Sequence, residues 1–446
     1  MNSRQKVTPA RSSSARLEAA RQLDENEERD AYVGLSRKDA GTNALLERGV
    51  RDLVSGVTRW QRYLDFLIES FYKGDASGIE KPMRTVLRMG IYELLFTRKP
   101  DHAVLNESVE TTKAHVRPGA GSLTNGLLRN ILRRRDSLPE PSGSQLRRIA
   151  IRHSHPDWMV GRWIQQWGEE DTVKFLEHNN QRPVFGVHIL SEKEAVLKAI
   201  EDAGAEWEPS PFLTDFIRVR SIQPLLRGGF LKRGAVRIQD EAAALVVKFV
   251  DPHPGSQVLD LCAAPGSKTT LLALLLEGTG RVVAADIHRR RLRLVKQNIA
   301  LSGVKNVQVE VADGAEPPAS WKQAFDHVLL DAPCTGFGVL GKRADMRWRR
   351  TESDLADLIV LQRKLMDGAA SCVKTGGILT YSTCSVDPEE NEAQVTAFLK
   401  DNVSFSLEDA PPSFPADLLH DGKTYLSLPF KTGMDGAFAA RLRRNR

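Results

Sequence analysis

Two cysteines that follow apolar runs are the residues best suited to chemistry in this chain. Cys334 comes directly after Asp331-Ala-Pro, and Cys384 follows Tyr381-Ser-Thr. Both preceding runs have the composition of buried parallel strands, and the carboxyl ends of such strands meet at one edge of a sheet. We therefore expect both thiols and the Asp331 carboxylate to lie at one site.

Thiols beside a carboxylate are suited to covalent catalysis on a pyrimidine ring. Carbon 5 of a pyrimidine is a poor nucleophile, but a thiolate added to carbon 6 makes carbon 5 able to attack a sulfonium methyl group. The carbon 5 proton must then be removed and the thiolate expelled. Asp331 would hydrogen-bond the polar edge of the ring and stabilise the developing charge. Residue types alone do not decide which of the two thiols adds to carbon 6. The alternative is that both cysteines are buried and only fill space in the core.

A helix is expected to begin close to Cys384. Asp387 has the type of an N-cap, Pro388 suits the first helical position, and Glu390 stands three residues after the cap. The N-terminus of a helix favours the thiolate form of a nearby cysteine.

A turn of small residues between a predicted strand and a predicted helix indicates a cofactor loop. The turn consists of Cys262, Ala263, Ala264, Pro265, Gly266, Ser267 and Lys268. Two further predicted strands end in acids, at Asp286 and Asp313. The G-x-G-x-x-G fingerprint of a nicotinamide site is absent, and the turn matches only the end of a phosphate-loop motif. S-adenosyl-L-methionine, with a ribose diol and no phosphate, fits these acids, although each acid could also cap a helix.

The elements that must position these residues follow from the pattern after residue 234. Short apolar runs alternate there with helix-length segments, which predicts a Rossmann-like, doubly wound α/β domain with a mostly parallel sheet over residues 234–446. The expected strands are Val258–Leu261, Arg281–Ala285, Val307–Val311, His327–Leu330 and Gly377–Tyr381. The expected helices between them are 268–277, 288–302 and 355–373.

The first part of the chain divides into three regions. Residues 1–25 are basic and poor in apolar side chains, which predicts a disordered tail, with a transit peptide as the alternative. Residues 26–138 carry apolar stripes at three-and-four spacing and predict an all-helical domain. A Pro/Ser/Gly-rich linker follows, and residues 145–233 mix helical and strand patterns, which predicts a small α+β subdomain.

Composition indicates the class of protein and the charge of its binding partner. The 446 residues are 41% hydrophobic and 27% charged, as in an ordinary globular protein, and four cysteines without metal-ligand spacing indicate reduced thiols in a cytoplasmic protein without a metal. No apolar run is long enough to span a bilayer. The net charge of +6 is concentrated in clusters that favour a polyanion such as RNA, bound in a salt-sensitive way. The clusters are 129–135, 289–293, 342–350 and 441–446.

Residues 234–446 resemble the Sun family of RNA (cytosine-5) methyltransferases. The likeness rests on the Cys262–Lys268 turn, Asp286, Ala-Asp313-Gly, Asp331-Ala-Pro-Cys334-Thr-Gly and Tyr-Ser-Thr-Cys384-Ser with Glu390-Asn-Glu392. The helical domain resembles NusB, through Arg88-Met-Gly-Ile-Tyr-Glu-Leu-Leu and Asn125-Gly-Leu-Leu-Arg-Asn-Ile-Leu-Arg. The combination is similar to the bacterial enzymes that methylate small-subunit ribosomal RNA, which implies a monomer that acts on that RNA before the subunit is fully assembled.

The resemblance implies a role for each site residue. It implies that the Cys262–Lys268 turn wraps S-adenosylmethionine, that Asp286 binds its ribose, and that Asp313 lies beside its adenine. Asp331 would lie between cofactor and base. It further implies that Cys384 is the nucleophile and that Cys334 assists release of the product.

The chain departs from the family pattern at four places. Ser267 replaces a second glycine, and His188-Ile-Leu replaces an arginine-valine-asparagine triplet. The other two departures are the stretches 342–349 and 431–438. The thiols and Asp331 are unaffected. Three alternatives to the cytosine methyltransferase remain: a uracil methyltransferase with the same thiol chemistry, a non-enzymatic RNA-binding protein, and a dehydrogenase, which the missing glycine fingerprint disfavours.

Overall fold

A computed structural model of the chain describes residues 10–29 and 44–445. The chain forms two compact units. The first, called the helical unit below, contains residues up to 180 together with 343–349, and the second, called the catalytic unit, contains residues 181–342 and 350–446. Within the described ranges, no helix is long and apolar enough to cross a membrane.

The helical unit contains an apolar core that is formed by its helices within residues 10–133. Its helices are α1 (Ala10–Arg29), α2 (Ala44–Phe71), α3 (Lys81–Phe96), α4 (Asp101–His115), α5 (Gly121–Arg133), α6 (Gln145–Arg152), α7 (Asp157–Asn180) and α13 (Met346–Arg349). Leu64 and Leu67 of α2, Val86 of α3, and Leu128 of α5 are all fully buried. The apolar stripes predicted from the sequence are thus the inward faces of these helices.

The prediction of disorder over residues 1–25 is wrong for residues 10–25. These residues belong to α1, and Ala19, Ala20 and Leu23 lie in the core of the helical unit. Arg16 is buried and donates hydrogen bonds to Ser108 Oγ (2.8 Å) and Thr111 Oγ1 (3.2 Å). Small alanines contribute little hydrophobicity to a pattern, so the stripe is weak in the sequence even though it packs closely. Residues 1–9 lie outside the described residues.

The segment 343–349 packs with the helical unit although it comes from the middle of the catalytic sequence. Arg347 is fully buried. Its guanidinium donates to the carbonyl oxygens of Arg59, Ser154 and Asn179 and to Asn180 Oδ1, over 2.8–3.2 Å. A buried cation is tolerated only when its donors find acceptors, so this side chain fixes the segment in the helical unit.

The catalytic unit begins with a small antiparallel sheet of order β2-β3-β1-β4. Its elements are β1 (Phe185–Ile189), α8 (Lys193–Asp202), β2 (Trp207–Pro209), β3 (Phe216–Val219), α9 (Gln223–Arg227) and β4 (Val236–Ile238). The observed subdomain differs from the expected range 145–233 at both of its ends. Residues 145–180 cluster with the helical unit, and β4 lies beyond residue 233 because it pairs with β1.

The second sheet of the catalytic unit has nine strands in the order β11-β12-β13-β9-β8-β5-β6-β7, with β10 paired to β13. The strands are β5 (Gln257–Leu261), β6 (Arg281–Asp286), β7 (Val307–Val311), β8 (Phe325–Asp331), β9 (Val373–Thr383), β10 (Phe405–Leu407), β11 (Leu419–His420), β12 (Thr424–Ser427) and β13 (Ala437–Arg444). The five strands β9, β8, β5, β6 and β7 run parallel, and β13 joins β9 antiparallel. The predicted mostly parallel, Rossmann-like sheet is confirmed.

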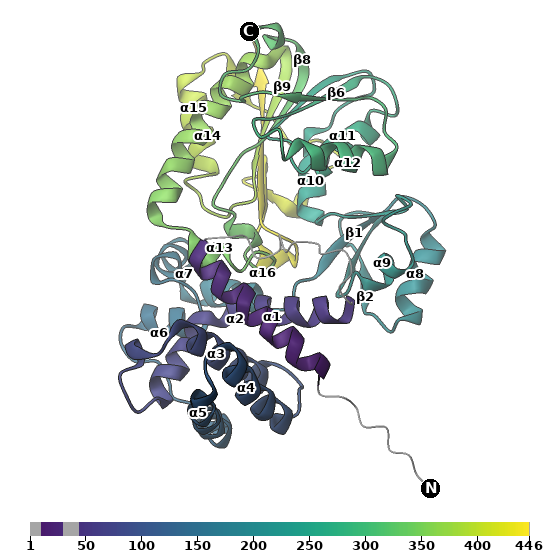
Figure 1. The fold of residues 1–446 in the computed structure, drawn as a ribbon. Helices are drawn as coiled ribbons and strands as arrows, with labels where there is room; N and C mark the ends of the chain where they lie inside the picture. Colours follow the sequence, from purple (N-terminus) through teal and green to yellow (C-terminus); the bar gives the residue numbers. More distant parts are fainter. Residues whose placement is uncertain (1–9, 30–43, 446) are drawn as a thin grey trace. The chain divides into compact units, whose positions relative to one another are not determined.

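Helices cover both faces of this sheet. They are α10 (Glu241–Val250), α11 (Ser267–Leu275), α12 (Leu292–Ser302), α14 (Glu352–Cys372), α15 (Glu392–Asp401) and the short α16 (Pro429–Thr432). Figure 1 shows α14 and α15 on one side of the sheet and α10, α11 and α12 on the other. Strands covered on both faces must be apolar throughout, which explains the continuous apolar runs of the sequence.

Two of the four basic clusters are structural and not free surface. In the cluster 342–350, Lys342 lies between Asp240 and Asp435, and Arg347 is buried. In the cluster 441–446, Arg441 is buried and donates to the carbonyls of Phe249 and Val250. The arginines of 129–135 and 289–293 are exposed, so these two clusters remain available to a polyanion.

Candidate active site

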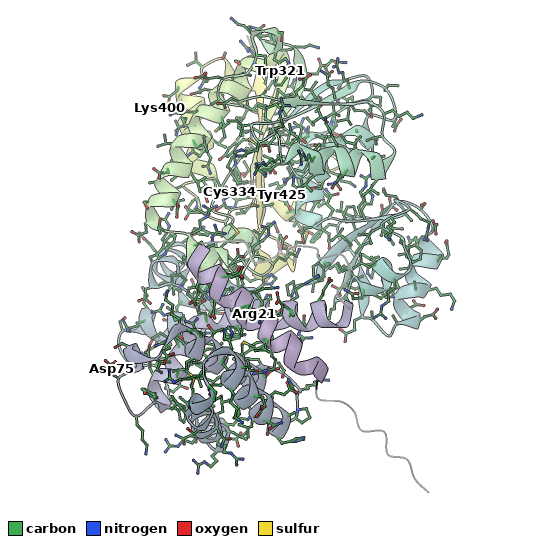
Figure 2. The ribbon with its side chains drawn as sticks, viewed as in Figure 1. Arg21, Asp75, Trp321, Cys334, Lys400 and Tyr425 are labelled. Atoms are coloured by element: carbon green, nitrogen blue, oxygen red, sulfur yellow. The ribbon has the colours of Figure 1, made fainter. Side chains whose placement is uncertain are left out.

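The two thiols predicted to meet do so. Strands β8 and β9 are parallel neighbours in which Asp331 pairs with Ser382, so both strands deliver their following residues to one edge of the sheet. The Sγ atoms of Cys334 and Cys384 lie 3.3 Å apart. Cys334 is 8% exposed and lies inside the catalytic unit (Figure 2), whereas Cys384 is half-buried.

The surroundings of the two thiols differ in their electrostatics. The hydrogen bond with Cys384, and then burial, raise the pKa of Cys334 well above its ordinary value, and the nearby Glu390 carboxylate adds to this. Cys334 is therefore held as a neutral thiol. Cys384 is the more exposed of the two thiols.

A lysine and an aspartate lie beside this pair of thiols. Lys268 Nζ contacts Asp331 Oδ2 at 2.7 Å, and Ser382 Oγ donates to Asp331 Oδ1 at 3.0 Å. Burial alone would lower the pKa of Lys268, but Asp331, followed by the negative charge of Cys384, raises it above its ordinary value. Lys268 is thus a fixed cation that stabilises negative charge on both Asp331 and Cys384.

The backbone of Cys384 is held by a contact between two glycines. Gly338 N–H donates to Cys384 O (3.0 Å), and Gly436 N–H donates to Gly338 O (2.8 Å). A Cβ on Gly338 would lie 2.6 Å from Gly436 Cα and 2.8 Å from Cys384 O. Both neighbours are backbone atoms that cannot rotate away, so only glycine lets these three segments meet.

We expect Gly338→Ala to lower both stability and activity. The added methyl group must push the Cys384 loop or the start of β13 aside, and overpacking of this kind costs about 1–3 kcal/mol in the free energy of unfolding. Urea unfolding and methyl transfer from labelled cofactor to RNA measure the two effects. Gly126→Ala is the control, because a Cβ there meets nothing within 4 Å. Equal behaviour of the two variants would contradict the close approach.

Glu390 organises the loop that carries Cys334. Its Oε1 accepts from Thr335 N–H (2.8 Å) and Gln362 Nε2 (2.9 Å), and its Oε2 accepts from Thr335 Oγ1 (2.5 Å). Arg350 donates to the carbonyl oxygens of Cys334 and Thr335 at 3.2 Å. The thiol loop is therefore fixed from both sides, which limits the movement of Cys334 relative to Cys384.

The helix predicted to begin at Asp387 begins later. The residues after Asp387 form a turn in which Glu389 N–H donates to Asp387 Oδ1, and α15 begins at Glu392. The reason is that Glu390, expected inside the helix, is turned inward to bind Thr335. The predicted helix N-terminus therefore does not directly follow Cys384, and the cation that interacts with this cysteine is Lys268.

The Cys262–Lys268 turn connects β5 to α11 as predicted. Cys262 and Gly266 both have positive φ (59° and 101°), so the chain reverses sharply between strand and helix. A Cβ on Gly266 would lie 2.9 Å from Val295 Cα of α12. The turn is further held by Arg291, which donates to Ala264 O (3.0 Å), and by Asn298, which donates to Pro265 O (2.8 Å).

The acids at the strand ends differ in exposure. Asp286, at the end of β6, is 3% exposed, and its oxygens accept from His288 N–H (2.8 Å) and Ala264 N–H (3.4 Å). Asp313 is exposed and accepts from Ala315 N–H (2.9 Å). The structure brings Asp286 to the cofactor turn, while Asp313 follows β7, the edge strand beyond β6. These carboxylates and the small-residue turn fit a nucleoside cofactor with a cationic centre.

Asp260, the penultimate residue of β5, is a buried acid beside the cofactor turn. Its side chain is fully buried; Oδ2 accepts from Thr269 Oγ1 (2.5 Å), and Oδ1 has no partner among the described residues. Burial raises its pKa to about 7 against the hydrogen bond from Thr269, which lowers it. The folded protein therefore prefers Asp260 neutral.

The Asp260→Asn variant should remove a pH dependence of stability. The folded-state pKa of Asp260 is raised, so its stabilising contribution is complete below about pH 4 and is lost as the pH rises to about 7. Over this window the wild type should lose up to about 1.4 kcal/mol of unfolding free energy per pH unit relative to the variant, and the difference should then level off. Urea unfolding of both proteins from pH 4 to pH 8 measures it, and parallel curves would contradict a neutral Asp260.

Two parts of the site were missed by the sequence prediction. Lys268 was assigned to the cofactor turn alone, but the structure places it against Asp331. Glu390 was expected as a helix residue, but it supports the thiol loop. The described parts of the chain contain no cluster of His, Cys, Asp or Glu that could hold a metal ion.

Family models match most of the chain. Residues 247–443 match the 16S rRNA methyltransferase RsmB/F family, residues 12–133 match the NusB family, and residues 155–225 match the ferredoxin-like domain of RsmF/B-like methyltransferases. The ferredoxin-like match includes β1 and β3 of the small sheet.

Individual proteins agree with these matches. The chain is 34% identical over 399 residues to ribosomal RNA small subunit methyltransferase B of Salmonella arizonae and 35% identical over 400 residues to that of Escherichia fergusonii, each comparison covering 88% of this chain and 89% of the relative. Among solved structures, PH0851 superimposes with a TM-score of 0.78 at 26% identity, over 99% of this chain and all of that one. NSun6 from Pyrococcus horikoshii shares the fold, with a TM-score of 0.55 at 21% identity over 64% of this chain and 97% of its own.

Proposed function

From the membership of this chain in the RsmB/F family of 16S rRNA methyltransferases, which use S-adenosylmethionine, we propose a specific reaction. The protein methylates carbon 5 of a cytosine in small-subunit ribosomal RNA through a covalent cysteine intermediate. We further propose that it acts as a cytoplasmic monomer, on RNA that is not yet buried in the finished subunit. The target cytosine must leave its stack to reach the buried thiols, which favours a loop or an unfinished particle as substrate.

The observation that carries the proposal is the pair of thiols in unequal surroundings. Cys334 is buried and held neutral, while Cys384 is half-buried and close enough to Lys268 for its charge to raise the lysine pKa. A nucleophilic cysteine needs access and benefits from a nearby cation, and Cys384 is the more exposed thiol and interacts with Lys268. These surroundings support Cys384 as the nucleophile independently of family resemblance.

The thiols can act in a fixed order. The Cys384 thiolate adds to carbon 6, and the electron pair displaced to carbon 5 attacks the methyl group. When bound, S-adenosylmethionine supplies that electrophilic methyl group. The Cys334 thiol then releases its proton to solvent, the carbon 5 proton passes to the resulting Cys334 thiolate, the carbon 5–carbon 6 double bond re-forms, and the Cys384 thiolate leaves. Lys268 stabilises the negative charge that develops on the polar edge of the base, and the Asp331 carboxylate accepts a hydrogen bond from the exocyclic amino group of cytosine.

Cys334 becomes a better base only after addition. Its pKa is raised first by the hydrogen bond with Cys384 and also by the negative charge of that sulfur. Once the Cys384 sulfur is bonded to carbon 6 it is a neutral thioether, so both causes weaken and Cys334 can lose its proton. The arrangement thus supplies a neutral thiol before addition and a base afterwards.

Binding of the cofactor is proposed for the residues at the ends of β5, β6 and β7. The Cys262–Lys268 turn would surround it, with Asp286 beside the ribose and Asp313 beside the adenine. Asp331 would stand between the cofactor and the base. The supporting observation is the sharp turn of small residues, with positive φ at Cys262 and Gly266, whose Ala264 N–H donates to the buried Asp286 carboxylate.

The base that is modified is identified by analysing the RNA itself. Small-subunit ribosomal RNA from cells with and without the gene should differ at one position in bisulfite sequencing, because 5-methylcytosine resists deamination. Nucleoside mass spectrometry distinguishes it from 5-methyluridine. A methylated uridine, or no difference between the two RNAs, would reject the cytosine assignment.

A further inference from the structure

A pocket lies beside the cofactor turn in the catalytic unit. It has a volume of about 210 Å³ and lies between β4, the first turn of α11 and the α12 helix. Arg237 and Gln239 line it from the β4 side, and Asn298 lines it from α12. Asn298 also donates to Pro265 O of the cofactor turn, so the pocket and the cofactor turn share a wall.

Two polar side chains that line this pocket, Arg237 and Gln239, have buried polar atoms without a partner among the described residues. Gln239 is 4% exposed, and both its Oε1 and its Nε2 are buried without a hydrogen bond among the described residues. The two terminal nitrogens of Arg237 are also buried without a hydrogen-bond partner among the described residues. Burial lowers the pKa of Arg237 to about 10, and no acid offsets the effect. Groups of this kind cost stability unless something binds them.

We propose that this pocket, called the Arg237 pocket, binds a guanine base of the RNA substrate close to the methylated cytosine. The inference rests on the proposed RNA substrate and extends it. Arg237 offers adjacent donors that match the O6 and N7 acceptors of guanine, and the Gln239 amide can both donate and accept. No carboxylate lines the pocket, so its guest must bring hydrogen-bond acceptors.

The remaining walls favour a base over a phosphate. Most of the exposed lining of the pocket is apolar, which suits the flat face of a ring but would desolvate a phosphate without compensation. Adenine would place its exocyclic amino donor against the guanidinium, and uracil has no pair of adjacent acceptors. Cytosine has such a pair only on its Watson–Crick edge, so a preference for cytosine in place of guanine in the test below would reject the guanine assignment. Single-stranded RNA is read in this way, by bases turned out into pockets.

The test uses the full-length protein and transcripts of small-subunit ribosomal RNA in which the nucleotides flanking the methylated cytosine are randomised. Bisulfite sequencing of the products shows which flanking bases permit methylation. The wild type should prefer guanine at one fixed distance from the cytosine. Arg237→Met and Gln239→Leu should each reduce that preference on the order of tenfold. Arg227→Met, at an exposed arginine on α9, is the matched control and should keep it.

Two further measurements separate this role from structural ones. Because the buried polar atoms of Arg237 and Gln239 have no partner in residues 10–29 and 44–445, apolar variants of these two residues should have thermal midpoints equal to or above that of the wild type. A lowered midpoint would assign the two side chains to folding and overturn the proposal. A raised KM for S-adenosylmethionine with an unchanged base preference would assign the pocket to the cofactor and overturn it also.

The outcomes for the pocket and for the proposed function can be told apart. Absence of any methylated cytosine in the transcripts would reject the proposed function. Methylation by the wild type without a preferred guanine, or with a preference that both pocket variants retain, would leave the function intact and reject the Arg237 pocket as a base-binding site.

Discussion

A Cys334→Ala variant incubated with S-adenosylmethionine and small-subunit ribosomal RNA should accumulate a covalent protein–RNA adduct. Cys384 is intact in this variant and can still add to carbon 6, but the group proposed to remove the carbon 5 proton is missing. Loss of a general base slows its step by about 10²–10⁴-fold, so the reaction should stop after methyl transfer. A denaturing gel shows the adduct as a band of reduced mobility that ribonuclease removes.

Cys372→Ala is the matched control for this experiment. Cys372 is also buried, but it lies at the end of α14 and its thiol donates to Gly368 O within the same helix. This variant should turn over without an adduct. If Cys334→Ala turned over at the wild-type rate, Cys334 would have no part in product release.

The Cys384→Ala variant should form no adduct and no methylated RNA. Without the thiolate, carbon 5 stays a poor nucleophile, and loss of an essential nucleophile lowers turnover by at least about 10⁴-fold. Transfer of a labelled methyl group to RNA measures the loss, and the Cys334→Ala/Cys384→Ala double variant should also fail to form the adduct. If Cys384→Ala formed an adduct and the double variant did not, Cys334 would be the nucleophile and Cys384 the residue that assists product release.

The arrangement of the site could be predicted from the sequence because it depends on local patterns. Each of Cys262, Asp286, Asp331 and Cys384 stands at or just beyond the end of an apolar run, and parallel strands bring such ends to one edge. The unequal electrostatics of the thiols could not be predicted in the same way. They depend on Lys268 and Glu390, whose partners Asp331 and Thr335 are distant in sequence.

The fold was predicted least well where packing outweighs local pattern. Residues 10–25 were expected to be disordered because alanines and arginines give a weak stripe, yet Arg16 finds partners on α4. The cluster 342–350 was expected as a basic surface because charge alone does not reveal that Arg347 is buried. Arg237 and Gln239 carry no motif, and only the pocket that surrounds them sets them apart.

The path of residues 343–349 makes the two units poor candidates for separation. Lys342 and Arg350 are anchored in the catalytic unit by Asp240 and by the Cys334 carbonyl, while Arg347 between them is buried in the helical unit. A fragment that begins at residue 181 would retain Arg347 but lose the carbonyl groups of the helical unit that accept its hydrogen bonds. Arg347 lies only three residues before Arg350, which holds the Cys334 loop. Replacement of the helical unit by that of a relative would therefore also require replacement of residues 343–349. We expect the sequences of the two units to change together in evolution.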